Sequence, residues 1–167
     1  MLDPSDLLAV ARVLLSVGAP SPPGQAQLRR AVSTAYYALF HKVLRTAAER
    51  FAGPGQEQSG AYAILYRSFD HGHMKRVCED LQVSTLKDRI KGPLRRDAVS
   101  QDTRDFAGIF PSLQDIRHLA DYDPTVRFLP SDVVSLIDSA EVAIEAFDRI
   151  TADEQADVLA LLMVRTR

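Results

Sequence analysis

Arg117 and Asp121 are the charged residues whose spacing first points to chemistry. Both lie in the stretch LQDIRHLADYDP, residues 113–124, where Arg117 interrupts an apolar helical stripe. A buried guanidinium needs a partner, because an unpaired charge inside a protein is very costly. Asp121 follows one helical turn later and can reach it. We interpret the two residues as a structural anchor at the edge of the core. The alternative is a functional arginine held at a groove or a subunit interface.

A second stretch with chemical potential is LRRAVSTAYYALFHKVL, residues 28–44. Its apolar residues recur with helical spacing and form an unusually wide face, along whose border Arg30, Tyr37 and His41 follow one another. Histidine can move protons near neutral pH, and arginine binds carboxylates and phosphates. The alternative is that His41 and the tyrosines are core residues whose polar atoms are hydrogen-bonded.

These two stretches together define a candidate binding groove between two helices. We predict that it is lined by Arg30, Tyr37, His41, Arg117 and Asp121. The sequence does not determine a catalytic residue. The candidates are Arg117, His118 and His41.

The common catalytic and cofactor motifs are missing from the chain. It contains no glycine-rich phosphate loop, no Gly-x-Ser-x-Gly elbow, no His-Glu-x-x-His and no Glu-x-x-His pair. His71 and His73 flank a single glycine, which is a weak pattern for a metal site. We therefore expect neither a metal ion nor a cofactor.

The hydrophobic periodicity predicts an all-α, up-and-down bundle of four or five main helices plus short helices. The expected helices cover residues 5–17, 25–51, 59–69, 74–81, 102–121, 131–147 and 152–164. Gly18 should end the first helix, and Pro111 predicts a kink or a division in the helix over 102–121. Residues 125–129 predict a short extended strap, and the sequence TADE at 151–154 predicts a capping box.

Residues 56–105 have the weakest periodicity, and the sequence does not define their structure. Within them, LKDRIKGPLRRDA at 86–98 concentrates positive charge and is broken by Gly92 and Pro93. We interpret this segment as a solvated loop. The alternative is a binding surface for an anionic ligand or an RNA backbone.

Composition indicates a single soluble domain over residues 1–167, with its core in 5–150 and a C-terminal helix at 152–164. Apolar residues make up 46% of the chain, charged residues 25%, and the net charge of −2 provides no global basic field for nucleic acid. Cys78 is the only cysteine, so no intrachain disulfide can form. No signal peptide or membrane span is expected, and we place the protein in the cytoplasm.

Read together, the two stretches resemble the HEPN domain family. The residues that carry the resemblance are Ser33, Tyr36, Tyr37, Ala38, Phe40 and His41 in the first stretch, and Arg117, Ala120, Asp121 and Tyr122 in the second. The family implies an up-and-down helical bundle that commonly forms a homodimer. Many members resemble ribonucleases of toxin–antitoxin, antiviral or CRISPR systems, and others bind nucleotides or partner a small nucleotidyltransferase.

The sequence departs from the nuclease members of that family. They carry an arginine that is usually followed by a polar residue, then by four to six further residues and then by a histidine. Here His118 follows Arg117 directly, and no later histidine exists. Arg67 and His73 have a fitting spacing but lie outside the usual motif position. The resemblance therefore implies a non-catalytic or weakly catalytic module.

We expect this module to form a homodimer and to bind a partner protein, a nucleotide or RNA in a prokaryotic stress or defence setting. Apolar surface on the helix over 25–51 and at 158–164 also favours a homodimer. A nucleotidyltransferase or an antitoxin is the candidate partner. One alternative is a metal-independent ribonuclease toxin, and another is a purely structural helical dimer without a ligand.

Overall fold

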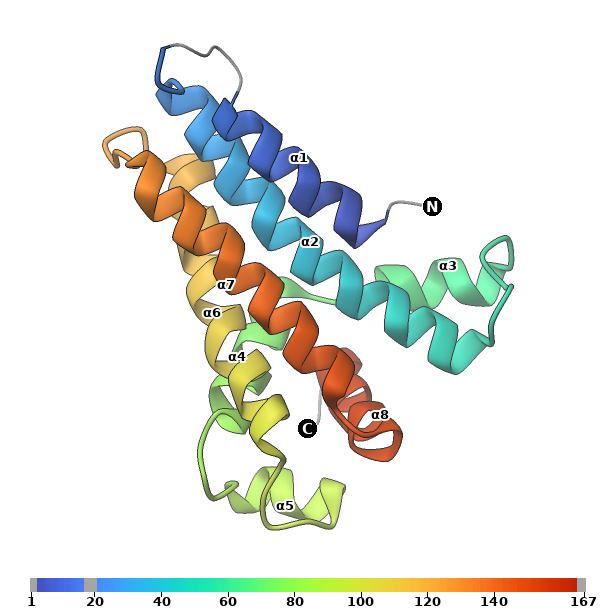
Figure 1. The fold of residues 1–167 in the computed structure, drawn as a ribbon. Helices are drawn as coiled ribbons and strands as arrows, with labels where there is room; N and C mark the ends of the chain where they lie inside the picture. Colours follow the sequence, from blue (N-terminus) through green and yellow to red (C-terminus); the bar gives the residue numbers. More distant parts are fainter. Residues whose placement is uncertain (1–2, 17–20, 165–167) are drawn as a thin grey trace.

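Four long helices form the body of the molecule, for which a computed structural model describes residues 3–16 and 21–164. They are α1 (Pro4–Ser16), α2 (Gln25–Ala52), α6 (Gln101–Tyr122) and α7 (Pro130–Arg149). The four helices alternate in direction along the chain and lie side by side (Figure 1). The described residues contain no strand, so the predicted all-α, up-and-down bundle is confirmed.

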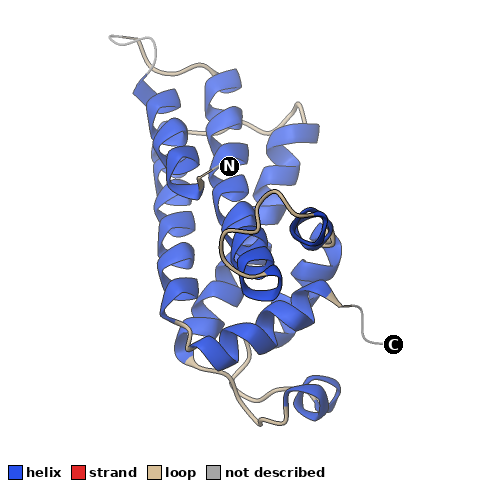
Figure 2. Ribbon diagram, turned by 90° about the vertical axis from the view of Figure 1, so that its right-hand side faces the viewer, coloured by secondary structure: helices blue, strands red, loops and turns tan. Residues whose placement is uncertain are grey.

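Four shorter helices complete the fold. They are α3 (Gly60–Arg67), α4 (His71–Leu81), α5 (Asp88–Leu94) and α8 (Ala152–Met163). α4 packs on α6 and α8, whereas α3 packs on α2 and projects from the bundle (Figures 1 and 2). The predicted end of the first helix, at Val17 and Gly18, lies outside the described residues.

The basic segment over 86–98 differs from its prediction, because it contains helix α5 and not a solvated loop. Its apolar side chains are buried: Leu86, Ile90 and Leu94. Lys87 and Arg89 both pair with the buried carboxylate of Asp80. Pro93 lies in the last turn of α5. Proline has no N–H to donate, so one of the few backbone hydrogen bonds of this short helix is missing. Much of the local positive charge is therefore already paired within the chain.

Helix α6 runs through Pro111 as one element, at the position where the sequence predicted a kink or a division. A proline inside a helix gives up the hydrogen bond to the carbonyl four residues earlier, here that of Ala107. The Pro111 ring is buried among core residues, and this packing offsets the lost bond. Of the two predicted alternatives, the division into two helices is therefore wrong, and the kink stays a prediction.

The segment after α6 is fastened to the start of α2 by two side chains. Arg29 donates hydrogen bonds to the carbonyl oxygens of Ala120 (2.8 Å), Asp123 (2.8 Å) and Val126 (2.6 Å). Gln25 both donates to the Phe128 carbonyl (2.8 Å) and accepts from its N–H (3.0 Å). Arg29 thereby satisfies carbonyls that the end of a helix leaves unpaired. Its positive charge also interacts favourably with the negative end of the helix dipole.

The start of α8 does not form the predicted capping box. The Thr151 side chain caps no backbone N–H. The Glu154 carboxylate reaches instead to Ser100 and Thr103 at the start of α6. A local sequence pattern was therefore overridden by a contact between distant elements.

Most of the apolar residues that favoured a homodimer lie inside the single chain, whereas Phe51 and Val164 are exposed. Four residues of α8 are buried: Val158, Leu159, Leu161 and Leu162. The wide apolar face of α2 is likewise covered by α1, α3, α6 and α7. This argument for a homodimer is therefore weakened, and the homodimer stays a prediction. None of the described helices combines the length and apolar character needed to cross a bilayer.

Candidate functional site

Arg117 lies at the centre of the candidate site, on the side of α6 that faces α2. Its guanidinium carbon is 5.1 Å from the ring centre of Tyr36 and 5.7 Å from that of Tyr37. Nη1 is 3.4 Å from the Asp121 carboxylate, and Arg117 is only 8% exposed. The buried Nε has no hydrogen-bond partner in the described structure. The predicted pairing of Arg117 with Asp121 is confirmed, and the pair holds the arginine against the rings.

Asp121 also connects α6 to α2. One carboxylate oxygen accepts a short hydrogen bond from the hydroxyl of Ser33, a buried residue of α2. The other oxygen faces Arg117, and the side chain is 28% exposed. Asp121 therefore uses both oxygens for internal contacts and fixes the position of Arg117 relative to α2.

His71 joins this site, and the sequence interpretation had not placed it there. It is the first residue of α4, and its Nδ1 shares a 2.6 Å hydrogen bond with the hydroxyl of the buried Tyr36. Its ring stacks on Phe40 with ring centres 4.1 Å apart. Asp70 precedes it as an N-cap and accepts a hydrogen bond from the His73 N–H. That N-cap pattern was the available sequence signal that a helix starts at His71.

His41 lies on the other side of Tyr37. Its Nδ1 shares a 2.7 Å hydrogen bond with the hydroxyl of Tyr66 on α3. The Tyr37 ring centre is 6.0 Å from that of His41 and 6.4 Å from that of His71. We name the group the arginine–histidine cluster, and it consists of Tyr36, Tyr37, Phe40, His41, His71 and Arg117.

The electrostatics of the cluster keep both histidines neutral at neutral pH. Burial lowers the pKa of His41. Burial and the positive charge of Arg117 lower the pKa of His71. Burial raises the pKa of the Tyr36 phenol, which therefore stays protonated. The cluster thus combines one fixed positive charge with two neutral imidazoles, a set that can bind an anionic group and exchange protons with it.

The lowered histidine pKa values predict how stability depends on pH. Below pH of about 6.5 the unfolded chain takes up protons at these histidines before the folded chain does. The free energy of unfolding should therefore fall as the pH is lowered from 7 towards 5. Chemical denaturation across this range checks the slope. In the double variant His41→Gln/His71→Gln the slope should be flatter, and an unchanged slope would contradict the assignment.

Other residues predicted for the site lie apart from the cluster. Arg30 is exposed and makes no ion pair within the described residues. His118 is exposed and contacts the Tyr122 ring at 4.8 Å, on a different side of α6 from Arg117. Arg67 and His73 do not form a shared site either, because Arg67 is exposed and His73 is buried against the Leu161 carbonyl.

A metal site is not formed by the histidines of α4. Nδ1 of His71 faces Tyr36, whereas Nε2 of His73 lies 2.9 Å from the carbonyl oxygen of Leu161. Among the residues that the structure describes, no group of three or more histidine, cysteine or carboxylate side chains could hold a metal ion.

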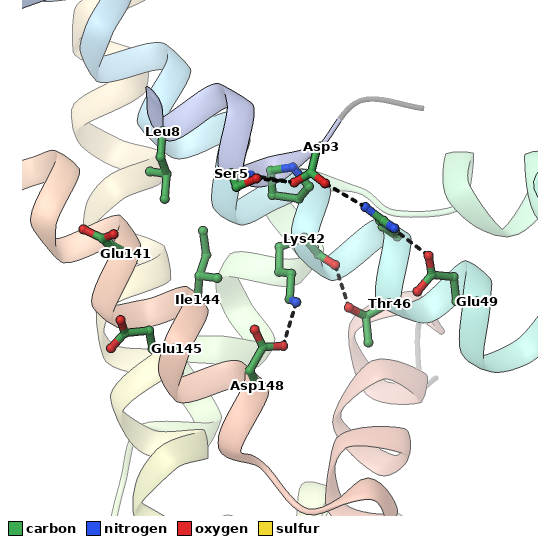
Figure 3. A pocket seen from close by; sticks show the side chains of 12 residues that line it. Asp3, Ser5, Leu8, Lys42, Thr46, Glu49, Glu141, Ile144, Glu145 and Asp148 are labelled. Atoms are coloured by element: carbon green, nitrogen blue, oxygen red, sulfur yellow. Dashed lines mark hydrogen bonds and ion pairs between the residues drawn. The ribbon is translucent and has the colours of Figure 1, made fainter. Parts of the chain in front are cut away.

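A separate hollow of 440 Å³ lies between α1, α2 and α7 (Figure 3). Its two cations are engaged by carboxylates of the same hollow. Lys42 pairs with Asp148 at 2.6 Å, and Arg45 pairs with Glu49 at 2.7 Å. These pairs stabilise the contacts between helices and leave the hollow with an excess of acidic groups, which is unsuited to a phosphate.

Comparisons of the chain with models of known protein families, with curated proteins and with solved structures found no match. The family resemblance therefore rests on the residues of the two stretches, and the function is argued from the arginine–histidine cluster.

Proposed function

We propose that this chain is a HEPN-type helical module that binds RNA or a nucleotide at the arginine–histidine cluster, with little or no catalysis of its own. The observation that supports this proposal is the placement of Arg117. Its guanidinium lies over two tyrosine rings and near enough to His71 to add to burial in lowering the pKa of that imidazole, and the Asp121 carboxylate pairs with it at 3.4 Å. Such a site offers a positive charge for a phosphate and the half-buried ring of Tyr37 for a base, whereas the Tyr36 ring is fully buried.

Equilibrium binding of a fluorescent single-stranded octauridylate RNA tests this proposal. Arg117→Lys keeps the positive charge but removes the planar guanidinium, so binding should weaken about tenfold. His41→Gln and His71→Gln should weaken it less, because they keep hydrogen-bonding atoms near the site. All measurements use one salt concentration, since phosphate contacts depend strongly on salt.

Arg50→Ala is the matched control for these variants. Arg50 is an exposed arginine near the other end of α2, and it makes no ion pair within the described residues. Its removal should change the affinity little. The proposal fails if Arg50→Ala and Arg117→Lys have equal effects, or if the wild-type protein binds neither RNA nor mononucleotides.

The second candidate is a metal-independent ribonuclease of a toxin–antitoxin system. A specific observation favours it, because the rings of His41 and His71 both contact the Tyr37 ring, which lies against Arg117. Two neutral histidines beside an arginine could move protons to and from an RNA strand while the arginine stabilises the phosphate charge. This arrangement would use histidines from α2 and α4, and not His118.

We nevertheless expect intrinsic RNA cleavage to be weak or absent. The Nδ1 atoms of both histidines are hydrogen-bonded to tyrosine hydroxyls, so these nitrogens are already engaged within the chain. Incubation of single-stranded RNA with the purified protein in a chelator checks this expectation. Cleavage that is lost in folded His41→Gln or His71→Gln would establish the ribonuclease instead.

The proposal includes a homodimer and a partner protein, in a prokaryotic stress or defence setting in the cytoplasm. The support is the resemblance of the two stretches to HEPN domains, many of which act with an antitoxin or a nucleotidyltransferase. Analytical ultracentrifugation distinguishes a dimer from the 18.5 kDa monomer. The purely structural dimer would be favoured if the protein dimerises but binds no RNA or nucleotide.

A further inference from the structure

A second hollow lies next to the arginine–histidine cluster, where α2 begins and α6 ends. Its volume of 530 Å³ is within the range of about 300–1,000 Å³ that is common for ligand pockets. The residues used in the argument below are Arg29, Asp121, Tyr122 and Arg127, all of which line it. Asp121 connects the hollow to the cluster, because its carboxylate pairs with Arg117.

The hollow carries exposed aromatic and cationic groups. Tyr122 is 68% exposed and its ring lies 4.8 Å from that of His118, which is also exposed. Arg127 is exposed and forms no ion pair within the described part of the chain. An exposed ring beside a free guanidinium is suited to stacking a base and contacting its phosphate.

The charge of the hollow also favours an anionic ligand. Arg29 donates its hydrogen bonds to backbone carbonyls and forms no ion pair within the described residues, although its charge, after the hydrogen bonds from a nearby threonine, also contributes to lowering the pKa of Asp123. Asp121 is the acidic residue of the hollow, and its two oxygens are bound to Ser33 and Arg117. Among the residues that line the hollow, two arginines therefore outweigh one carboxylate that is already paired.

We propose that this hollow is a second nucleotide subsite, so that the ligand is a strand of single-stranded RNA and not a mononucleotide. One nucleotide would occupy the arginine–histidine cluster, and a neighbouring one would stack on Tyr122 with its phosphate at Arg127. This inference rests on the proposed function. It adds the length of the ligand and the residues that bind its second nucleotide.

The geometry of the helices matches a ligand longer than one nucleotide. At about 1.5 Å per residue, the twelve residues from Arg29 to His41 span roughly 18 Å along α2. Arg30 is exposed on the stretch of α2 between the two subsites and can meet the backbone of a strand that crosses it. A mononucleotide would fill one subsite and leave the other empty.

A competition experiment with fluorescent octauridylate RNA tests the subsite. The competitors are uridine monophosphate, the dinucleotide UpU and unlabelled octauridylate. The octamer should bind at least tenfold more tightly than the mononucleotide. Tyr122→Ala and Arg127→Ala should each weaken octamer binding about tenfold, as is typical for loss of a stacked base or a phosphate contact, and leave the mononucleotide unaffected. Both side chains are exposed, so the variants should fold, and Arg50→Ala again serves as the control.

The outcomes distinguish failure of the second subsite from failure of the proposed function. If Arg117→Lys weakens binding while Tyr122→Ala and Arg127→Ala bind the octamer like the wild type, the subsite is overturned and the cluster stands. Equal affinities for the mononucleotide and the octamer also overturn it. Binding of the mononucleotide without any binding of RNA overturns the subsite alone. If Arg117→Lys has no effect, or neither RNA nor the mononucleotide binds, the proposed function fails and the subsite falls with it.

Discussion

Arg117→Ala is expected to lower the free energy of unfolding by about 3 kcal/mol, because it removes a buried side chain together with its ion pair. The guanidinium packs on the Tyr36 and Tyr37 rings, so alanine leaves a gap between α2 and α6. Asp121 keeps its hydrogen bond from Ser33 but loses the charge that balances it. Thermal and chemical denaturation of the purified variant measure the loss.

Two comparisons identify the source of that loss. The double variant Arg117→Met/Asp121→Leu removes both charges and retains apolar volume, so it should be less destabilised than Arg117→Ala. Arg12→Ala removes an ion-pairing arginine from the surface, where the side chain is 44% exposed, and should cost less than about 1 kcal/mol. A wild-type melting temperature in Arg117→Ala would show that the pair is not a structural anchor.

The parts of the fold that sequence predicted well are those determined by local spacing. The long helices have 3.6-residue apolar patterns and clear ends, and helix α2 begins at Gln25 as predicted. Arg117 and Asp121 are four residues apart in one helix, so assigning that stretch as helical was enough to predict the pair.

Contacts between distant elements were not predictable in the same way. His71 and Tyr36 are 35 residues apart, and His41 and Tyr66 are 25 apart. Both contacts depend on where the short helices α3 and α4 fold back onto α2. Those helices lie in the region of weak periodicity, so the sequence did not determine their positions. The histidines of the cluster were therefore assigned only in part.

The role of Arg29 was missed for a related reason. Its partners are backbone carbonyls at 120–126, and a backbone atom has no sequence signature. The same applies to the short helix α5. Its basic residues suggested a solvated loop, whereas the buried Asp80 that binds two of them precedes the segment and belongs to α4.

Glu154 shows how a local sequence pattern can predict the wrong hydrogen-bond partner for a side chain. The sequence TADE suggested that Glu154 would reach back to the backbone of Thr151. In the structure one carboxylate oxygen accepts from the Ser100 N–H at 2.8 Å and from the Thr103 hydroxyl at 2.5 Å. The other oxygen pairs with Arg96 at 3.3 Å. Glu154 therefore joins α8 to the start of α6 and to the segment that follows α5.

Glu154→Leu should consequently lower the free energy of unfolding by about 3 kcal/mol, because buried polar partners lose their acceptor. Glu154 is 8% exposed and the Thr103 side chain is fully buried, so water cannot easily replace the carboxylate. Burial raises the pKa of Glu154, but the hydrogen bonds from Thr103 and Ser100 lower it by more. The carboxylate is therefore ionised at neutral pH, and its contribution should be lost only as the pH falls below about 4.5.

Glu154→Gln separates hydrogen bonding from charge, since the amide oxygen can still accept from Ser100 and Thr103. It should cost about 1 kcal/mol, and less than Glu154→Leu. Glu145→Leu, on the exposed side of α7 with a side chain 65% exposed, is the control and should stay within about 0.5 kcal/mol of the wild type. Denaturant titrations of the three variants at pH 7 give the comparison. If Glu154→Leu were no more destabilised than Glu145→Leu, the carboxylate would contribute no net stability to the junction between α8 and α6.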